Sequence, residues 1–135
     1  MKAAVPERIL LVEDDERMVK LLRALLELSE FQIFVASSGD AAVNRAMEIQ
    51  PNLVILDLLL PDMSGYEVCR RLRRSFQPWT LPILMLTGLD QPVDQLRGFA
   101  FGADAYLTKP TRPEELIKTV KLLLGHPDPE LSATG

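Results

Sequence analysis

Short apolar runs of strand length alternate along this chain with segments of helical period. The first run, Ile9 to Val12, is followed by apolar residues spaced 3, 1, 3 and 3 apart, as in an amphipathic helix: Met18, Leu21, Leu22, Leu25 and Leu28. Four more such pairs follow, with strands expected at 32–36, 53–56, 83–86 and 105–108 and helices at 41–49, 66–72, 93–101 and 116–124. Alternation of this kind favours a parallel sheet covered by helices, so we predict an α/β domain of five strand-helix units.

Two of the runs, 53–56 and 83–86, are apolar without interruption, which is typical of central parallel strands buried on both faces. Hydrophobic residues make up 47% of the chain and charged residues 25%, the balance of a globular protein and not of a disordered one. We expect one domain at 7–125, with short flexible ends at 1–6 and 126–135.

Two helix starts have the spacing of a capping box, in which a hydroxyl and an acid three residues later satisfy exposed backbone N–H groups. These pairs are Ser64 with Glu67 and Thr111 with Glu114. Both predicted helix starts follow closely on a polar strand end.

Polar residues stand where the apolar runs end: Glu13 and Asp14 after the first, Asp57 after the third, Thr87 after the fourth and Lys109 after the fifth. In an open α/β sheet, ligands bind outside the carboxyl ends of the strands. In a doubly wound sheet of order 2-1-3-4-5, the first and third strands flank the point where the strand order reverses. That topology brings the three acids face to face.

The chemistry of this group of residues suits a phosphoryl group. Two unit charges roughly 4 Å apart repel by about 4 kcal/mol at an effective dielectric constant of about 20, so clustered carboxylates need a cation. Oxygen ligands with open positions favour Mg²⁺. Lys109 and Thr87 can hold phosphoryl oxygens. A carboxylate can be the nucleophile in phosphoryl transfer, and Asp57, at the end of a central strand, is the natural acceptor.

Four motifs in order resemble the receiver domains of two-component response regulators. They are ILLVEDD at 9–15, VILDLLLPDMSGYE at 54–67, PILMLTG at 82–88 and GADAYLTKP at 102–110. The resemblance covers about residues 7 to 125. It implies a flavodoxin-like fold: a doubly wound, five-stranded parallel sheet of order 2-1-3-4-5 flanked by five helices.

The resemblance also assigns roles. Asp57 would accept a phosphoryl group from a phosphohistidine on a sensor kinase. Asp14, Asp57 and the backbone carbonyl of Leu59 would ligate Mg²⁺, with Glu13 helping through water. Thr87 and Lys109 would contact the phosphoryl group.

Two further features are implied near the last strand. Tyr106 would be the switch aromatic, turning inward when Thr87 moves towards the phosphate, and the Lys109-Pro110 peptide bond would be cis. Leu59 and Leu89 stand two residues after the acceptor and the threonine, positions that modulate access of water in similar proteins. We expect this apolar rim to slow autodephosphorylation.

Expected partners are a sensor histidine kinase or phosphotransfer protein and a downstream effector protein or fused output domain. A homodimer through the fourth helix, fifth strand and fifth helix is possible, and so are a stand-alone receiver and a fragment of a larger regulator. The net charge of −4 argues against direct nucleic-acid binding. The single cysteine, Cys69, and the lack of a long apolar segment before Glu13 favour the cytoplasm and no membrane association.

Two other functions remain open. A phosphohydrolase of the haloacid dehalogenase kind also uses a strand-end aspartate, Mg²⁺, a threonine and a lysine, but it expects an acid two after the nucleophile, where this chain has Leu59. A receiver-like module could also bind partners without phosphorylation. We expect a phosphoacceptor signalling domain and not an enzyme, with only self-catalysed phosphotransfer and slow autodephosphorylation.

Overall fold

A computed structural model describes residues 5–76 and 80–127 of the 135-residue chain. Of the flexible ends expected at 1–6 and 126–135, residues 1–4 and 128–135 lie outside the described residues. The strands are β1 (Arg8–Val12), β2 (Gln32–Ala36), β3 (Leu53–Leu56), β4 (Ile83–Thr87) and β5 (Ala105–Thr108). The helices are α1 (Glu16–Leu28), α2 (Gly39–Ile49), α3 (Gly65–Ser75), α4 (Pro92–Ala100) and α5 (Pro113–Leu123). All ten elements expected from the sequence are present.

The strands form one parallel sheet in the order β2-β1-β3-β4-β5. The predicted doubly wound topology is therefore confirmed. The chain order reverses between β1 and β3, whose register pairs Val12 with Leu56. The residues that follow these two strands consequently leave the sheet side by side.

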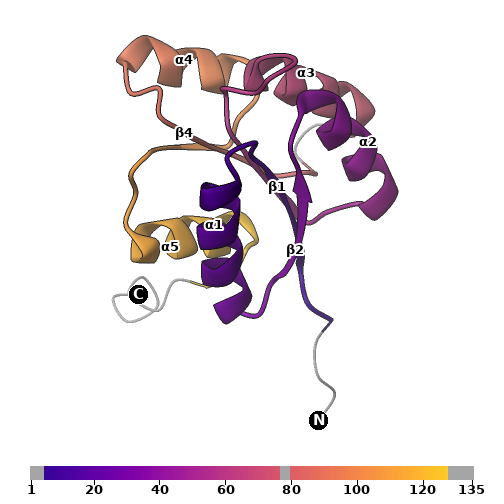
Figure 1. The fold of residues 1–135 in the computed structure, drawn as a ribbon, viewed down its shortest axis with the longest axis vertical. Coiled ribbons are helices and arrows are strands. Elements are labelled where there is room, and N and C mark those ends of the chain that lie inside the picture. The colour runs from indigo at the N-terminus through magenta and orange to yellow at the C-terminus, as the bar shows by residue number, and fades with distance from the viewer. Residues whose placement is uncertain (1–4, 77–79, 128–135) are drawn as a thin grey trace.

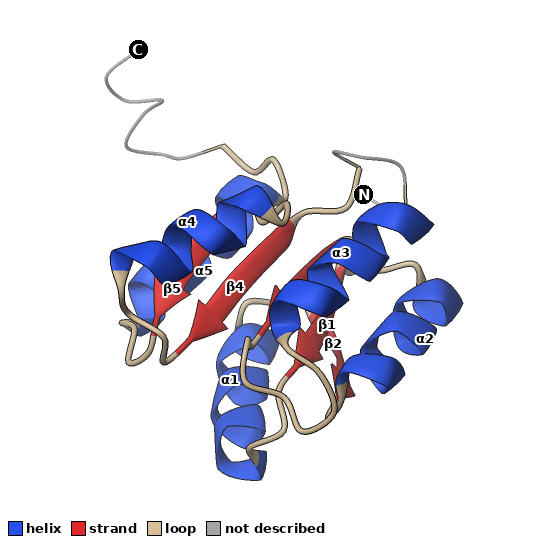
Figure 2. Ribbon diagram, turned by 90° about the horizontal axis from the view of Figure 1, so that it is seen from above, coloured by secondary structure: helices blue, strands red, loops and turns tan. Residues whose placement is uncertain are grey.

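Helices cover both faces of the sheet. Figure 1 shows α1 and α5 on one side and α2, α3 and α4 on the other, and Figure 2 shows the same layers from above. Such coverage explains why β3 and β4 are buried along their whole length. Among the residues that the structure describes, no helix is both long enough and apolar enough to span a bilayer.

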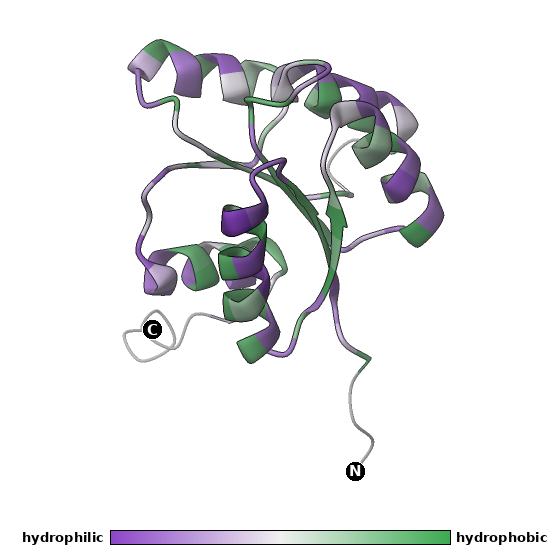
Figure 3. Cartoon of the chain, in the orientation of Figure 1, coloured by the Kyte–Doolittle hydropathy of each residue, from purple (hydrophilic) through white to green (hydrophobic). Residues whose placement is uncertain are grey.

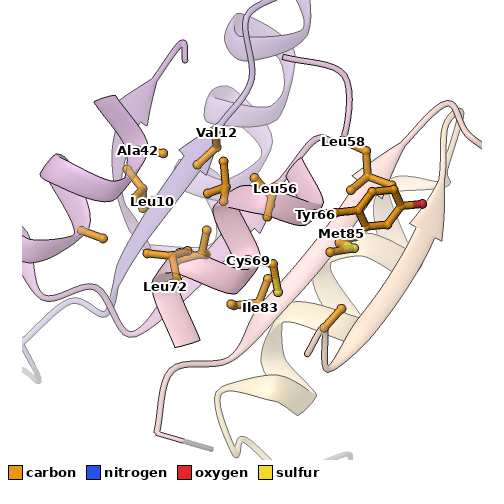
Figure 4. Close-up of a cluster of buried hydrophobic side chains, with 14 of the residues drawn as sticks. Leu10, Val12, Ala42, Leu56, Leu58, Tyr66, Cys69, Leu72, Ile83 and Met85 are labelled. Carbon is orange, nitrogen blue, oxygen red and sulfur yellow. The ribbon is translucent and has the colours of Figure 1, made fainter. Parts of the chain in front are cut away.

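The core consists of two hydrophobic clusters, one on each face of the sheet. Alternate strand residues supply both, because successive side chains of a strand point to opposite faces. Leu10, Val12, Leu56 and Met85 pack under α2 and α3, whereas Ile55 and its neighbours pack under α1 and α5. Figure 3 shows the apolar colouring concentrated along the strands, and Figure 4 shows the first cluster beneath α3.

The buried face of α1 differs from the periodic pattern. Leu22 and Leu26 are its buried residues, while Leu21 and Leu28 are 64% and 83% exposed. A stripe spaced by three and four residues fixes the period of a helix but not which edge of the stripe faces the sheet. The helix begins at an N-cap, Asp15, whose carboxylate accepts two backbone N–H groups.

The two predicted capping boxes fare differently. Ser64 caps α3, and its hydroxyl accepts the N–H of Glu67 at 3.3 Å, although the Glu67 side chain pairs with arginines. The Thr111 box is wrong, because α5 has Arg112 as its N-cap, without a side-chain bond, and Pro113 as its first residue. A proline fits the first helical position since its fixed φ matches and its missing N–H would have no helical partner.

Candidate functional site

The first and third strands bring two acids together. β1 and β3 end in register, and the backbone N–H of Asp57 donates to the carbonyl of Val12 at 3.0 Å. Glu13 follows Val12 directly, so its side chain emerges beside that of Asp57. Both acids are almost fully buried, with Glu13 2% and Asp57 6% exposed.

Lys109 joins these acids from the loop after β5. Its ammonium contacts a carboxylate oxygen of Glu13 and lies 3.1 Å from Oδ2 of Asp57. The Lys109 side chain is 19% exposed, so the three charges share a poorly solvated space. The Lys109-Pro110 peptide bond is cis, as expected. Residues 96 positions apart in the chain thus meet at one edge of the sheet.

Burial shapes the titration of the ion pair. Desolvation raises the pKa of Glu13, and the charge of Asp57 adds to this, although the Lys109 ammonium works in the opposite direction. Desolvation lowers the pKa of Lys109, but the bond to Glu13 and the charge of Asp57 outweigh it, so that pKa is raised overall. Lys109 therefore stays a cation, and it is the group that makes the buried acids tolerable.

Asp14 completes a group of acids that can hold a metal ion. Carboxylate oxygens of Glu13, Asp14 and Asp57 all lie within 4.8 Å of one another. Asp14 is exposed, so one side of the group is open to solvent. Three carboxylates face one ammonium, and an all-oxygen donor set with this excess negative charge fits a hard divalent cation. The site thus has a place for a metal as well as for the lysine.

Thr87 and Tyr106 lie on the next two strands of the sheet, β4 and β5. The β3–β4 register pairs Leu56 with Met85, so Thr87 stands one residue beyond the level of Asp57. Thr87 is fully buried, and its hydroxyl accepts the N–H of Leu89 at 3.4 Å. The Tyr106 ring lies inward at 7% exposure, and its hydroxyl donates to the carbonyl of Leu89 at 2.7 Å. Both predicted switch residues therefore contact the segment between β4 and α4.

The loop after β3 and the start of α3 contain one predicted site residue, Leu59, and two residues that were not predicted, Asp62 and Gly65. The N–H of Leu59 donates to Oδ1 of Asp57 at 3.2 Å, which orients the carboxylate. Asp62 accepts the N–H groups of Gly39 and Asp40 at the start of α2, and these bonds lower its pKa. A Cβ at Gly65 would lie 2.4 Å from the carbonyl oxygen of Asp57. Two signals in the sequence could have pointed to these residues: Asp62 is an acid shortly before α3, and Gly65 directly follows the helix cap Ser64.

The arginine cluster at the end of α3 is mostly paired within the protein. Arg70 and Arg71 bind Glu67 and lower its pKa to about 2. Arg73 donates to the carbonyls of Leu81 and Gly102 and to the Asp104 carboxylate. The Arg70 and Arg71 side chains lie at the surface, 42% and 44% exposed, whereas the Arg73 side chain, 15% exposed, is a structural bridge.

Comparison with known proteins identifies relatives among transcriptional regulators. The chain is 42% identical over 118 residues to the alkaline phosphatase synthesis transcriptional regulatory protein PhoP of Bacillus subtilis, covering 87% of this chain and 48% of the relative. It is 42% identical over 127 residues to the phosphate regulon transcriptional regulatory protein PhoB of Rhizobium meliloti, covering 94% of this chain and 56% of the relative. The chain spans about half the length of these relatives.

Solved structures match over nearly their whole length. The chain is similar to the BeF3-activated N-terminal receiver domain of Klebsiella pneumoniae RstA, with 34% identity and a TM-score of 0.82, covering 87% of this chain and 98% of that one. It is also similar to a putative response regulator from Chloroflexus aurantiacus, with 36% identity and a TM-score of 0.83. That match covers 90% of this chain and 100% of the other.

The family model of the response regulator receiver domain matches residues 9–121, which include every strand end described above. This match places the chain in a different family from the haloacid dehalogenase phosphohydrolases, the enzyme alternative that the sequence left open. The chain belongs to the response regulator receiver domains, the phosphorylation-switched signalling domains of two-component systems.

Proposed function

We propose that Asp57 is the residue phosphorylated in this receiver domain. The observation that carries the proposal is the Asp57 carboxylate itself, 6% exposed at the end of a central strand, with the Lys109 ammonium 3.1 Å away. One oxygen is oriented by the N–H of Leu59 and the other by Lys109. A carboxylate held in this way is ready for in-line attack on phosphorus.

The proposed step transfers a phosphoryl group from a phosphohistidine donor to Asp57. A carboxylate oxygen of Asp57 forms the new P–O bond while the P–N bond of a phosphohistidine donor breaks and its electron pair returns to the donor imidazole. The Lys109 ammonium and the Thr87 hydroxyl stabilise the negative charge on the transferring oxygens. Lys109 also contacts Glu13, so a phosphoryl group added to Asp57 would redistribute the hydrogen bonds of the Lys109 ammonium.

Mg²⁺ is the metal we propose for the acidic group. Asp14 and Asp57 would hold it with the backbone carbonyl of Leu59, and Glu13 would act through a water molecule. The bound ion would neutralise charge on the phosphoryl oxygens. Support comes from the oxygen-only donors, whose separation of at most 4.8 Å suits a small divalent cation.

The partners we propose are a sensor histidine kinase or phosphotransfer protein upstream and an effector protein or fused output domain downstream, in the cytoplasm. We place the domain limits at 7–125. A homodimer could use the face formed by α4, β5 and α5, since Leu96 and Phe99 of α4 are 70% and 48% exposed. On this account the domain is a switch whose only chemistry is self-catalysed phosphotransfer and slow dephosphorylation.

The lifetime of the phosphoprotein follows from the rim of the site. Leu89 is partly buried against the core beside Thr87, and Leu59 is 58% exposed after Asp57. Two apolar side chains there would disfavour an attacking water. Decay of the labelled protein in Mg²⁺ should therefore take minutes or longer and should accelerate in Leu59→Asn and Leu89→Asn. A lifetime of seconds in the native protein would reject the shielding.

Phosphorylation itself is tested with acetyl phosphate and Mg²⁺, read by intact mass. The native protein should gain one phosphoryl group, and Asp57→Asn should gain none under the same conditions. Chelating the metal should abolish labelling of the native protein. Equal labelling of the Asp57→Asn protein would refute Asp57 as the acceptor, and turnover of simple phosphate esters would refute the switch.

A further inference from the structure

Tyr66, the second residue of α3, contacts α4 through three different groups. Its hydroxyl donates to the backbone carbonyl of Asp94 at 3.1 Å. Its ring lies 5.4 Å from that of Phe101, centroid to centroid, and the Arg97 guanidinium carbon is 5.7 Å from its centroid. Residues 94, 97 and 101 lie on one face of α4 and its C-terminal cap. Tyr66 therefore contacts that face from the first turn of the helix to its cap.

The position of Tyr66 leaves its ring buried and its hydroxyl turned towards α4. The residue is 8% exposed, and Figure 4 shows the ring beside Leu58 and Met85. Burial, with the charge of Asp94 second, raises the pKa of Tyr66 above its ordinary value, so the hydroxyl remains a donor at neutral pH. In an α-helix the carbonyl of Asp94 is the partner of the Gly98 N–H, and its second lone pair is open to Tyr66.

The backbone of Gly65 links Tyr66 to the strand end that carries Asp57. The preceding residue, Gly65, donates its N–H to the carbonyl of Leu58 at 2.9 Å. A side chain at Gly65 would lie 2.4 Å from the Asp57 carbonyl oxygen and 2.7 Å from Cα of Leu58. The start of α3 therefore rests on the backbone of the acid, and a shift of that backbone must move Gly65 and with it Tyr66.

The second tyrosine, Tyr106, contacts both α4 and the segment that precedes it. Tyr106 donates to the carbonyl of Leu89, and its ring would lie 3.0 Å from a Cβ at Gly98. Tyr66 and Tyr106, from α3 and β5, thus both donate to backbone carbonyls between β4 and the first turn of α4. Two tyrosine hydroxyls therefore bind the backbone of α4 and of the segment before it.

We propose that Tyr66 is a positioning residue that couples Asp57 to α4 along a second route, parallel to the one through Thr87 and Tyr106. This inference rests on Asp57 being the site of phosphorylation. The route runs from the Asp57 backbone through Gly65 to the Tyr66 hydroxyl and the Asp94 carbonyl. A tyrosine that merely filled the core would need its ring but not its hydroxyl.

The test uses Tyr66→Phe, which retains the ring, in the full chain with Mg²⁺ and beryllofluoride, followed by amide NMR. Losing one neutral hydrogen bond changes an equilibrium by roughly 2- to 10-fold. Because coupling is reciprocal, the apparent affinity for beryllofluoride should change by up to that factor. The amides near Leu59 should shift as in the native protein at saturation, whereas those of Gln95 and Gly98 should shift less.

Three further variants complete the design. Phe101→Leu weakens the ring contact on the same route and should act in the same direction. Tyr66→Phe combined with Tyr106→Phe should reduce the α4 response more than either change alone. Thr119→Val removes an exposed hydroxyl bond within α5, to the carbonyl of Glu115, and should leave the response unchanged.

The outcomes separate the two proposals. Unchanged α4 shifts and affinity in Tyr66→Phe would overturn the second route while leaving phosphorylation of Asp57 intact, and so would an equal loss in Thr119→Val. Failure of the native protein to respond near Leu59 would instead refute the proposed function.

Discussion

Replacing Lys109 with methionine keeps the length of the side chain but removes the ammonium from two buried acids. At the 3.1 Å separation from Asp57, a unit charge pair is worth about 5 kcal/mol at an effective dielectric constant of about 20. Relief of the desolvation of Lys109 offsets part of this. Breaking a buried pair destabilises a protein by about 3–5 kcal/mol, and the 19% exposure of Lys109 favours the lower end, about 3 kcal/mol.

The loss should depend on pH in a defined direction. Without Lys109, burial and the charge of Asp57 raise the pKa of Glu13 further, because the lysine ammonium no longer opposes them. A carboxyl whose folded pKa exceeds its unfolded pKa is accommodated best below the unfolded value, near 4.5, and stability is lost as the pH rises through the folded pKa. The deficit of Lys109→Met should be small at about pH 4 and complete at about pH 8.

Urea unfolding in EDTA measures this effect. With a slope of about 1–3 kcal/mol per molar, a deficit of about 3 kcal/mol lowers the midpoint by roughly 1–3 M at neutral pH. Lys121→Met, at an exposed position in the last turn of α5, is the matched control and should change stability by less than about 1 kcal/mol. A deficit for Lys109→Met that matches the control, or that does not change between acid and neutral pH, would refute the electrostatic reasoning.

Three further predictions concern the loops and the core. Asp62→Asn should lower the melting temperature at neutral pH, and the gap should close as the pH falls through the lowered pKa of Asp62, because the charged form accepts the N–H groups of Gly39 and Asp40; a gap that persists in acid would contradict this. Burial raises the pKa of Cys69 to about 11, so a thiol reagent at about pH 8 should react with it only after unfolding. Rapid labelling of the native protein would show that the Cys69 thiol is not protected by burial. Gly65→Ala should lower the free energy of unfolding by about 1–3 kcal/mol in urea and reduce acetyl phosphate labelling. Gly88→Ala, where a Cβ meets nothing within 4 Å, is the control and should be tolerated. Equal effects of the two changes would rule out the contact of Gly65 with the Asp57 backbone.

The sequence predicts the sheet and the acidic site well because both depend on local patterns. Uninterrupted apolar runs mark β3 and β4, and a polar residue ends each run, so the strand order alone brings Glu13 beside Asp57. The pairing of Lys109 with these acids follows from their shared edge of the sheet.

Features that depend on tertiary placement could not be predicted in this way. The bond from Tyr66 to the Asp94 carbonyl requires α4 to lie at a particular height beside α3, and no residue pattern encodes a backbone acceptor. Exposure of Leu21 depends on the rotation of α1 about its axis, which the period leaves free. The helix α5 begins later than the Thr111 cap predicted, because Pro113 takes the first helical position.

A structure of the protein with Mg²⁺ and beryllofluoride tests the central claim most directly. The account predicts beryllofluoride bonded to a carboxylate oxygen of Asp57, contacted by Lys109 and Thr87, with the metal beside Asp14. An unmodified Asp57 under saturating conditions, or beryllofluoride attached to a different side chain, would contradict it.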